Sequence, residues 1–141
     1  MYQETKEIAG QVQVSLDITR GFLSDILVTA FDGGYGGSWY WARPHMQTPE
    51  QGPKFWLEVD GDYWMAVHII ESDVSEGDSP RAFYINHHTL LLGLNKLFQP
   101  GVLPKRGDIR SAVIAQEAGN IDSDAADVIV QLACFGELVY G

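Results

Sequence analysis

The clearest secondary-structure signal in the chain is the stretch FWLEVDGDYWMAVHII, residues 55–70. Its two apolar runs, 55–59 and 63–70, are separated by a short polar segment that begins Asp60-Gly61. An Asp-Gly pair adopts the positive φ angles of a type I′ turn at little cost, so the stretch predicts an antiparallel β-hairpin. This hairpin places sheet structure in the middle of the chain.

Two further strands are predicted upstream of the hairpin. Residues 11–18, QVQVSLDI, alternate strictly between polar and apolar side chains, which is typical of a half-buried strand. Residues 38–43, SWYWAR, predict a short aromatic strand. On that strand Trp39 and Trp41 are expected to share one face, while Tyr40 takes the other.

Four helices are expected around this sheet, one before it and three after it, because apolar residues recur there at helical spacing. Their expected N-caps are Thr19, Asn86, Asp108 and either Asp122 or Ser123. The sequence thus predicts an α+β fold, in which a small antiparallel sheet packs against one N-terminal and three C-terminal helices. We expect one domain over residues 1–141, with residues 1–10 as a candidate disordered tail.

Composition excludes several classes of protein. The chain has 141 residues, of which 45% are hydrophobic and 20% charged, so wholesale disorder is not expected. A net charge of −10 argues against direct nucleic-acid binding, which needs a basic surface. Cys134 is the single cysteine, so no intramolecular disulfide is expected, and no apolar run reaches 18 residues. We therefore predict a cytoplasmic protein that does not span a membrane.

No cofactor or metal site is predicted. The acid-rich stretch 122–127, DSDAAD, lacks the glycine that a calcium-binding EF-hand loop requires, and helix capping explains its carboxylates. The four histidines are scattered or adjacent, without the HExxH spacing of a zinc site. Cys134 lies in an apolar helical context with no basic neighbour in sequence, so it is expected to pack inertly.

The most unusual stretch is DGGYGGSWYWAR, residues 32–43, which combines four glycines with four aromatic residues. Its glycines follow a helix and precede a strand, which is the reverse of a phosphate-binding loop. One interpretation is a ligand platform with stacking aromatics and an arginine for an anionic group. Its predicted ligand-binding residues are Asp32, Gly33, Gly34, Tyr35, Trp39, Trp41 and Arg43. The other interpretation is a helix end, a tight turn and a core strand.

A second candidate surface is acidic. Between residues 55 and 80 the chain carries seven acids and no lysine or arginine, which amounts to −7 of the net −10. These acids are Glu58, Asp60, Asp62, Glu71, Asp73, Glu76 and Asp78. They predict either an interface for a basic partner protein or a solvated face that protects an edge strand.

The C-terminal part of the chain carries a resemblance. The runs AGNID (118–122), ADVIVQ (126–131) and FGELVYG (135–141) resemble the ending of a family of small uncharacterised proteins of actinobacterial phages and their hosts. Members also resemble this chain at Asp32-Gly33-Gly34 and Tyr40-Trp41, so the resemblance covers about half of it. The chain departs from the family by Asp32 in place of an expected Glu and by the extra Tyr35-Gly36-Gly37. The resemblance implies a phage or mobile-element setting and no particular activity.

Three classes of function are left open by these observations. The first is a non-enzymatic accessory protein that captures a small, nucleotide-like ligand at residues 32–43, as a counter-defence protein would. The second is an acidic inhibitor of a basic host protein, or a nucleic-acid mimic. The third is a small enzyme with Asp32 as its acid or base. The apolar residues 135–140 are a candidate contact for a homo-oligomer.

Overall fold

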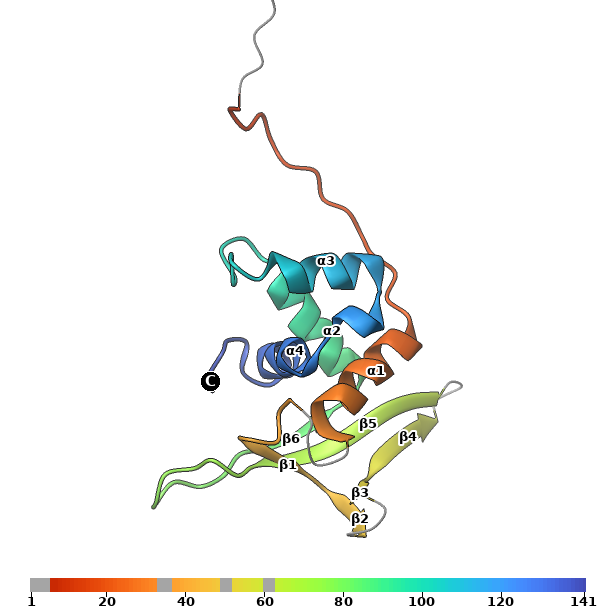
Figure 1. Ribbon diagram of the computed structural model, residues 1–141, viewed down its shortest axis with the longest axis vertical. Helices are drawn as coiled ribbons and strands as arrows, with labels where there is room; N and C mark the ends of the chain where they lie inside the picture. Colours follow the sequence, from red (N-terminus) through yellow and green to blue (C-terminus); the bar gives the residue numbers. More distant parts are fainter. Residues whose placement is uncertain (1–5, 33–36, 49–51, 60–62) are drawn as a thin grey trace, which may run out of the picture.

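The computed structural model describes residues 6–32, 37–48, 52–59 and 63–141 (Figure 1). One helix, α1 (Arg20–Phe31), precedes six strands: β1 (Ala42–Pro44), β2 (Met46–Thr48), β3 (Gly52–Pro53), β4 (Phe55–Val59), β5 (Tyr63–Glu71) and β6 (Ala82–Ile85). After them come α2 (His87–Leu97), α3 (Gly107–Ala115), a short 3₁₀ helix (Ala118–Asn120) and α4 (Ser123–Phe135). The predicted α+β class is confirmed.

The main sheet is antiparallel and is built around β5. The predicted hairpin is confirmed, because β4 pairs with the first half of β5 from Phe55↔Val67 to Val59↔Tyr63. Strand β1 pairs with the last three residues of β5, and β6 pairs with residues 67–70. Strands β2 and β3 form a separate two-stranded ribbon.

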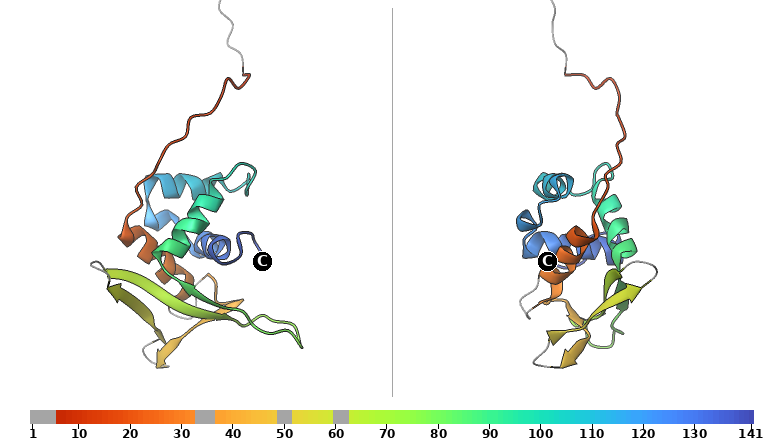
Figure 2. Two further views of the ribbon diagram at one scale, coloured as in Figure 1. Left: turned by 180° about the vertical axis from the view of Figure 1, so that it is seen from behind. Right: turned by 90° about the vertical axis from the view of Figure 1, so that its right-hand side faces the viewer.

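The helices lie on one face of this sheet, where α1, α2 and α4 pack against its strands (Figure 2). Along β5, Val67 and Ile69 point into the core, whereas His68 and Ile70 are exposed on the opposite face. This alternation follows from the two-residue period of a strand. Helices α1, α2 and α4 complete the core, with α4 lying between the other two and contacting both.

The predicted N-caps are confirmed for three of the four helices. Thr19 accepts a hydrogen bond from Phe22 N at 3.2 Å, and Asn86 accepts one from Thr89 N at 3.1 Å. Asp122 does the same for Ala125 N at 2.8 Å.

The prediction for Asp108 was wrong. Helix α3 starts one residue earlier, at Gly107, with Arg106 in the N-cap position. Asp108 instead lies in the first turn of the helix, where its negative charge interacts favourably with the positive end of the helix dipole. The same carboxylate forms a salt bridge with Arg106 at 3.1 Å.

The predicted N-terminal strand over residues 11–18 was also wrong. This segment runs as an extended arm outside the sheet, and none of the described strands pairs with it. Alternation specifies which side chains share a face, but a strand forms only where another backbone supplies hydrogen bonds. The base of the arm is held at α3, where Gln116 donates to the Asp17 carbonyl at 2.6 Å and accepts from Thr19 N at 2.9 Å.

The aromatic strand predicted over residues 38–43 is mostly a turn, and only Ala42–Pro44 joins the sheet. Gly37 and Ser38 donate backbone hydrogen bonds to the last carbonyls of α1, at 3.2 and 3.1 Å. The N–H groups of Trp41 and Ala42 then turn back to the Ser38 carbonyl. The last carbonyls of a helix have no partner within the helix, and here they accept hydrogen bonds from the residues that follow. These hydrogen bonds hold the backbone in a turn, so the extended strand begins only at Ala42.

Candidate functional site

A buried carboxylate joins α4 to the turn that follows α1. Asp127 is 5% exposed, and each of its oxygens accepts two hydrogen bonds. Oδ1 accepts from Ser38 Oγ at 2.9 Å and from Trp41 Nε1 at 2.7 Å. Oδ2 accepts from the Tyr40 hydroxyl at 2.7 Å and from Gln131 Nε2 at 2.9 Å. These four donors replace the water that the carboxylate loses on burial. We call these five residues the Asp127 cluster.

The turn reaches Asp127 because Gly37 lies directly against the start of α4. A Cβ atom on Gly37 would overlap the backbone carbonyl of Ser123, so the two backbones approach this closely only with glycine at this position. Ser38 follows and is fully buried. Tyr40 and Trp41, which a strand would point to opposite faces, both bind Asp127 because the backbone turns between them.

The Tyr40 hydroxyl is a donor that stays protonated. Its burial and its hydrogen bond to the Asp127 carboxylate raise the pKa of Tyr40 well above the usual value of 10.0. Losing the proton would place a phenolate beside a carboxylate. The hydroxyl also accepts a hydrogen bond from Gln131 Nε2 at 3.1 Å.

Gln131 extends the cluster to the C-terminal residues. Its Oε1 accepts from the backbone N–H groups of Val139 and Tyr140, each at 2.9 Å. The ring of Tyr140 then stacks on Trp41 with their centroids 5.0 Å apart and their planes within 11°. Residues 135–140, predicted as a dimer contact, thus fold back on their own chain, although Leu138 and Val139 remain partly exposed.

A second buried carboxylate, Glu71, lies at the end of β5. Arg81 forms a two-pronged ion pair with it, at 2.7 and 3.0 Å, and the Tyr140 hydroxyl donates to the same carboxylate. The Arg81 guanidinium is the main reason that the pKa of Glu71 falls to about 2. Glu71 therefore supports the fold, and its prediction as part of an exposed acidic interface was wrong.

Three side chains within residues 39–43 remain accessible to solvent at this turn. The guanidinium of Arg43 lies 5.0 Å from the centre of the Trp39 ring, a cation–π distance, and donates to the Trp39 carbonyl. The Trp39 indole N–H donates to the Phe31 carbonyl at the end of α1, at 2.6 Å. Arg43 is exposed, Trp39 is half-buried and Tyr40 is 48% exposed, so the three present aromatic and cationic groups to solvent.

The residues predicted to bind a ligand have four different placements. Trp39 and Arg43 lie together at the surface, whereas Trp41 is fully buried, which corrects the prediction that it contacts a ligand. Asp32 is the C-cap of α1 and donates its backbone N–H to Val28. Gly33, Gly34 and Tyr35 lie outside the described residues.

The remaining acidic residues that were predicted to form an interface also differ in their placement. Asp73, Glu76 and Asp78 are exposed on the connection between β5 and β6. Asp60 and Asp62 lie outside the described residues, and Glu58 is described only by its backbone in β4.

Asp127 and Gln131 were not identified as site residues from the sequence. Helix capping was expected to explain the carboxylates of residues 122–127, but Asp127 lies one full turn into α4. A signal was present in ADVIVQ, where two polar residues four positions apart fall on one face of an otherwise apolar helix. The segments that carry the family resemblance also meet here, because Tyr40 and Trp41 bind Asp127.

Among the described residues, no group of three or more histidine, cysteine or acidic side chains is arranged to hold a metal ion. None of the helices in the same ranges is long and apolar enough to cross a membrane. Comparison of the chain with protein-family models, curated proteins and solved structures found no match.

Proposed function

We propose that the protein is a non-enzymatic accessory protein that captures a small, planar, anionic ligand of the nucleotide type beside Trp39 and Arg43. The setting we propose is the phage or mobile element that the family resemblance implies, with sequestration in counter-defence as the role. The observation that carries the proposal is the accessible Trp39–Arg43 pair on a turn anchored by the Asp127 cluster.

The chemistry of this surface matches that ligand class. A half-buried indole offers an apolar face to a planar ring, and a neighbouring guanidinium offers several N–H donors to phosphate or carboxylate oxygens. The buried hydrogen bonds of Asp127 fix the turn before any ligand arrives, so less conformational entropy is lost on binding. Both oxygens of Asp127 are occupied by structural donors, which favours a scaffolding role over proton transfer.

The first experiment is native mass spectrometry of gently purified protein. We expect a stoichiometric additional mass that is lost on denaturation. The purified protein is then titrated with AMP, with a cyclic dinucleotide and with inorganic phosphate, with tryptophan fluorescence as the readout. Arg43→Gln and Trp39→Phe are expected to weaken binding at least tenfold, whereas Lys105→Gln on a distant exposed loop leaves it unchanged. Equal binding by all four proteins contradicts the proposed site.

A second candidate function is an acidic contact with a basic partner protein. It is favoured by the β5–β6 connection, residues 72–81, which extends away from the helices in Figures 1 and 2 and exposes Asp73, Glu76 and Asp78. Binding through these charges should weaken steeply between 50 and 500 mM salt. Replacing the three acids by their amides should have the same effect, and a partner retained unchanged under both conditions contradicts this candidate.

A further inference from the structure

The outer face of the sheet, opposite the helices, displays aromatic and apolar side chains. None of the described helices lies on this face in Figures 1 and 2. His68, Ile70 and Tyr84 point outward there, and all three are exposed. The rings of His68 and Tyr84 lie against each other with their centroids 4.5 Å apart. Aromatic rings on an open sheet face are a recurrent platform on which nucleobases stack.

The register of the sheet places Arg43 on the same face. Arg43 is the exposed residue of β1, between two buried neighbours, and it is paired with Ile70 of β5. The pairing of His68 with Tyr84 lies two residues away along β5, a distance of about 7 Å. Arg43 also lies 5.0 Å from the centre of the Trp39 ring. Arg43 therefore has one aromatic group in the turn before β1 and an aromatic pair across the sheet.

Charge favours an anionic ligand on this surface. Strands β1 and β6 contain no acidic residue, and the one acid of β5, Glu71, is buried on the opposite face with Arg81. The whole chain, by contrast, carries nineteen acids against nine basic residues. Nη1 of Arg43 donates to the carbonyls of Trp39 and Ala42, which orients the guanidinium. The other two nitrogens of a guanidinium carry further N–H groups that can bind a phosphate.

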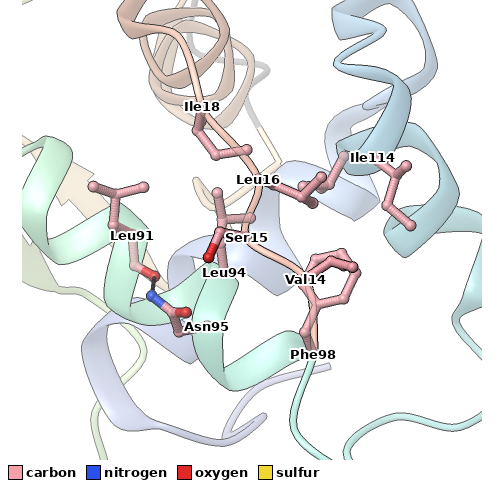
Figure 3. A pocket seen from close by; sticks show the side chains of 10 residues that line it. Val14, Ser15, Leu16, Ile18, Leu91, Leu94, Asn95, Phe98 and Ile114 are labelled. Atoms are coloured by element: carbon pink, nitrogen blue, oxygen red, sulfur yellow. Dashed lines mark hydrogen bonds between the residues drawn. The ribbon is translucent and has the colours of Figure 1, made fainter. Parts of the chain in front are cut away.

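The apolar groove beside α2 and α3 is less suited to an anion. This groove of about 420 Å³ lies where residues 14–18 meet the two helices (Figure 3). Its walls include Phe98 and Ile114 and carry no charged side chain among the residues that the structure describes. It therefore offers no cationic group that would hold a phosphate.

We infer that the ligand is a dinucleotide, in which a phosphodiester joins two planar bases, and this inference rests on the proposed function. One base stacks on Trp39, the phosphate binds Arg43, and the second base stacks on Tyr84 and His68. Strands β1 and β6 pair with opposite edges of β5, so they lie about 10 Å apart. A single base beside Trp39 and Arg43 does not span this width, whereas a second base linked through the phosphate can.

The surroundings of this surface limit the length of the ligand. The β5–β6 connection leaves the same end of the sheet and exposes Asp73, Glu76 and Asp78. A longer single strand brings one more negative charge with each nucleotide into the field of this acidic chain. We therefore expect repulsion to offset the contacts that further nucleotides would make.

The test compares AMP with adenylyl-adenosine (ApA), which has two adenines and one phosphate, by isothermal titration calorimetry on the full chain. ApA carries less negative charge than AMP, so tighter binding of ApA reports the second base. We expect ApA to bind at least about tenfold more tightly, within the range of one base stacked on an aromatic ring. Tyr84→Ala should remove this gain and leave the affinity for AMP unchanged. Tyr84→Phe keeps the ring and should retain both affinities.

Phe98→Ala is the matched control. Phe98 is an aromatic residue of similar exposure, 39% against 36% for Tyr84, but it lies at the C-cap of α2 and lines the groove. Its replacement should leave the affinities for AMP and ApA unchanged. Loss of ApA binding in Phe98→Ala but not in Tyr84→Ala would place the ligand in the groove and overturn the inference.

The outcomes separate this inference from the proposed function. Equal binding of AMP and ApA, both weakened by Arg43→Gln, overturns the dinucleotide and leaves the proposed site standing. A preference for ApA that Tyr84→Ala leaves intact also overturns the inference. Failure of both ligands to bind the wild-type chain overturns the proposed function as well. Tighter binding of a ten-residue oligothymidylate than of ApA overturns the dinucleotide in favour of single-stranded nucleic acid.

Discussion

The indole N–H of Trp41 donates a 2.7 Å hydrogen bond to the carboxylate of Asp127, 86 residues further along the chain. This contact joins the turn after α1 to the middle of α4. Ser38 and Tyr40 add two more hydrogen bonds to the same carboxylate, so three of four consecutive residues in the turn bind one side chain. The half-buried Trp39 and the exposed Arg43 take their positions from this anchored backbone.

Asp127→Asn is expected to lower the free energy of unfolding by about 1–3 kcal/mol. An amide group offers one acceptor oxygen, so its NH₂ group would face two of the donors that now bind Asp127. Urea denaturation followed by tryptophan fluorescence measures the change. Asp25→Asn on the exposed face of α1 is the control and should shift stability by less than about 0.5 kcal/mol. A neutral effect of Asp127→Asn would mean that the cluster does not hold the turn.

Glu71 should make the protein sensitive to acid. Its pKa is about 2 in the folded protein against 4.5 for a free glutamate, so the stabilisation it provides is complete above about pH 4.5 and is lost as the pH falls toward 2. Glu71→Gln should reduce stability at pH 7 by about 1 kcal/mol, after allowance for solvent around Arg81. It should also flatten the decline of stability below pH 4.5. Glu137→Gln on the exposed tail should retain the wild-type profile.

Gly93 lies where the backbones of α2 and α4 pack closely together. A Cβ atom at this position would lie 2.8 Å from Ala133 N and 2.9 Å from the Ile129 carbonyl oxygen, both of them backbone atoms. Gly93→Ala should therefore destabilise the protein by about 1–3 kcal/mol, even though alanine favours helix. Gly21→Ala in α1 is the matched control, because a Cβ atom at this position meets nothing within 4 Å. This substitution should stabilise the protein by up to about 1 kcal/mol. Thermal unfolding of the two variants should move in opposite directions.

Cys134 should react slowly in the native protein. Burial raises the pKa of its thiol to about 12, so very little thiolate is present at pH 8. We expect its reaction with a disulfide reagent to be at least about 100-fold slower than that of free cysteine. The reaction should become fast and stoichiometric in denaturant. Rapid reaction under native conditions would show that α4 opens readily near its C-terminal end.

The predictable parts of the fold are those encoded by neighbouring residues. Helices α1, α2 and α4 were predicted with their caps, because helical spacing and an N-cap side chain act within one or two turns. The β4–β5 hairpin was predicted because its turn residues adjoin the runs that pair. Strand β6 was not predicted, since its four residues pair with β5 across the acidic connection and carry no turn signal of their own.

The candidate site was predicted only in part for a related reason. Composition singled out residues 32–43, and Trp39 and Arg43 do lie together at the surface. The sequence does not show that Trp41 turns inward, because that depends on the end of α1 and on a carboxylate 86 residues away. It also does not show that Glu71 is withdrawn from the acidic surface by Arg81 and Tyr140.

The sequence by itself determined the α+β class, three capped helices, the central hairpin and the acidic balance of the chain. Each of these depends on periodicity, turn chemistry or charge within a few residues. Tertiary structure alone decided that residues 11–18 lie outside the sheet and that Asp127 accepts hydrogen bonds from four donors. It also decided that the C-terminal residues fold back on Trp41. Those outcomes depend on which distant groups satisfy a buried backbone or charge, and such pairing is settled only when the elements pack.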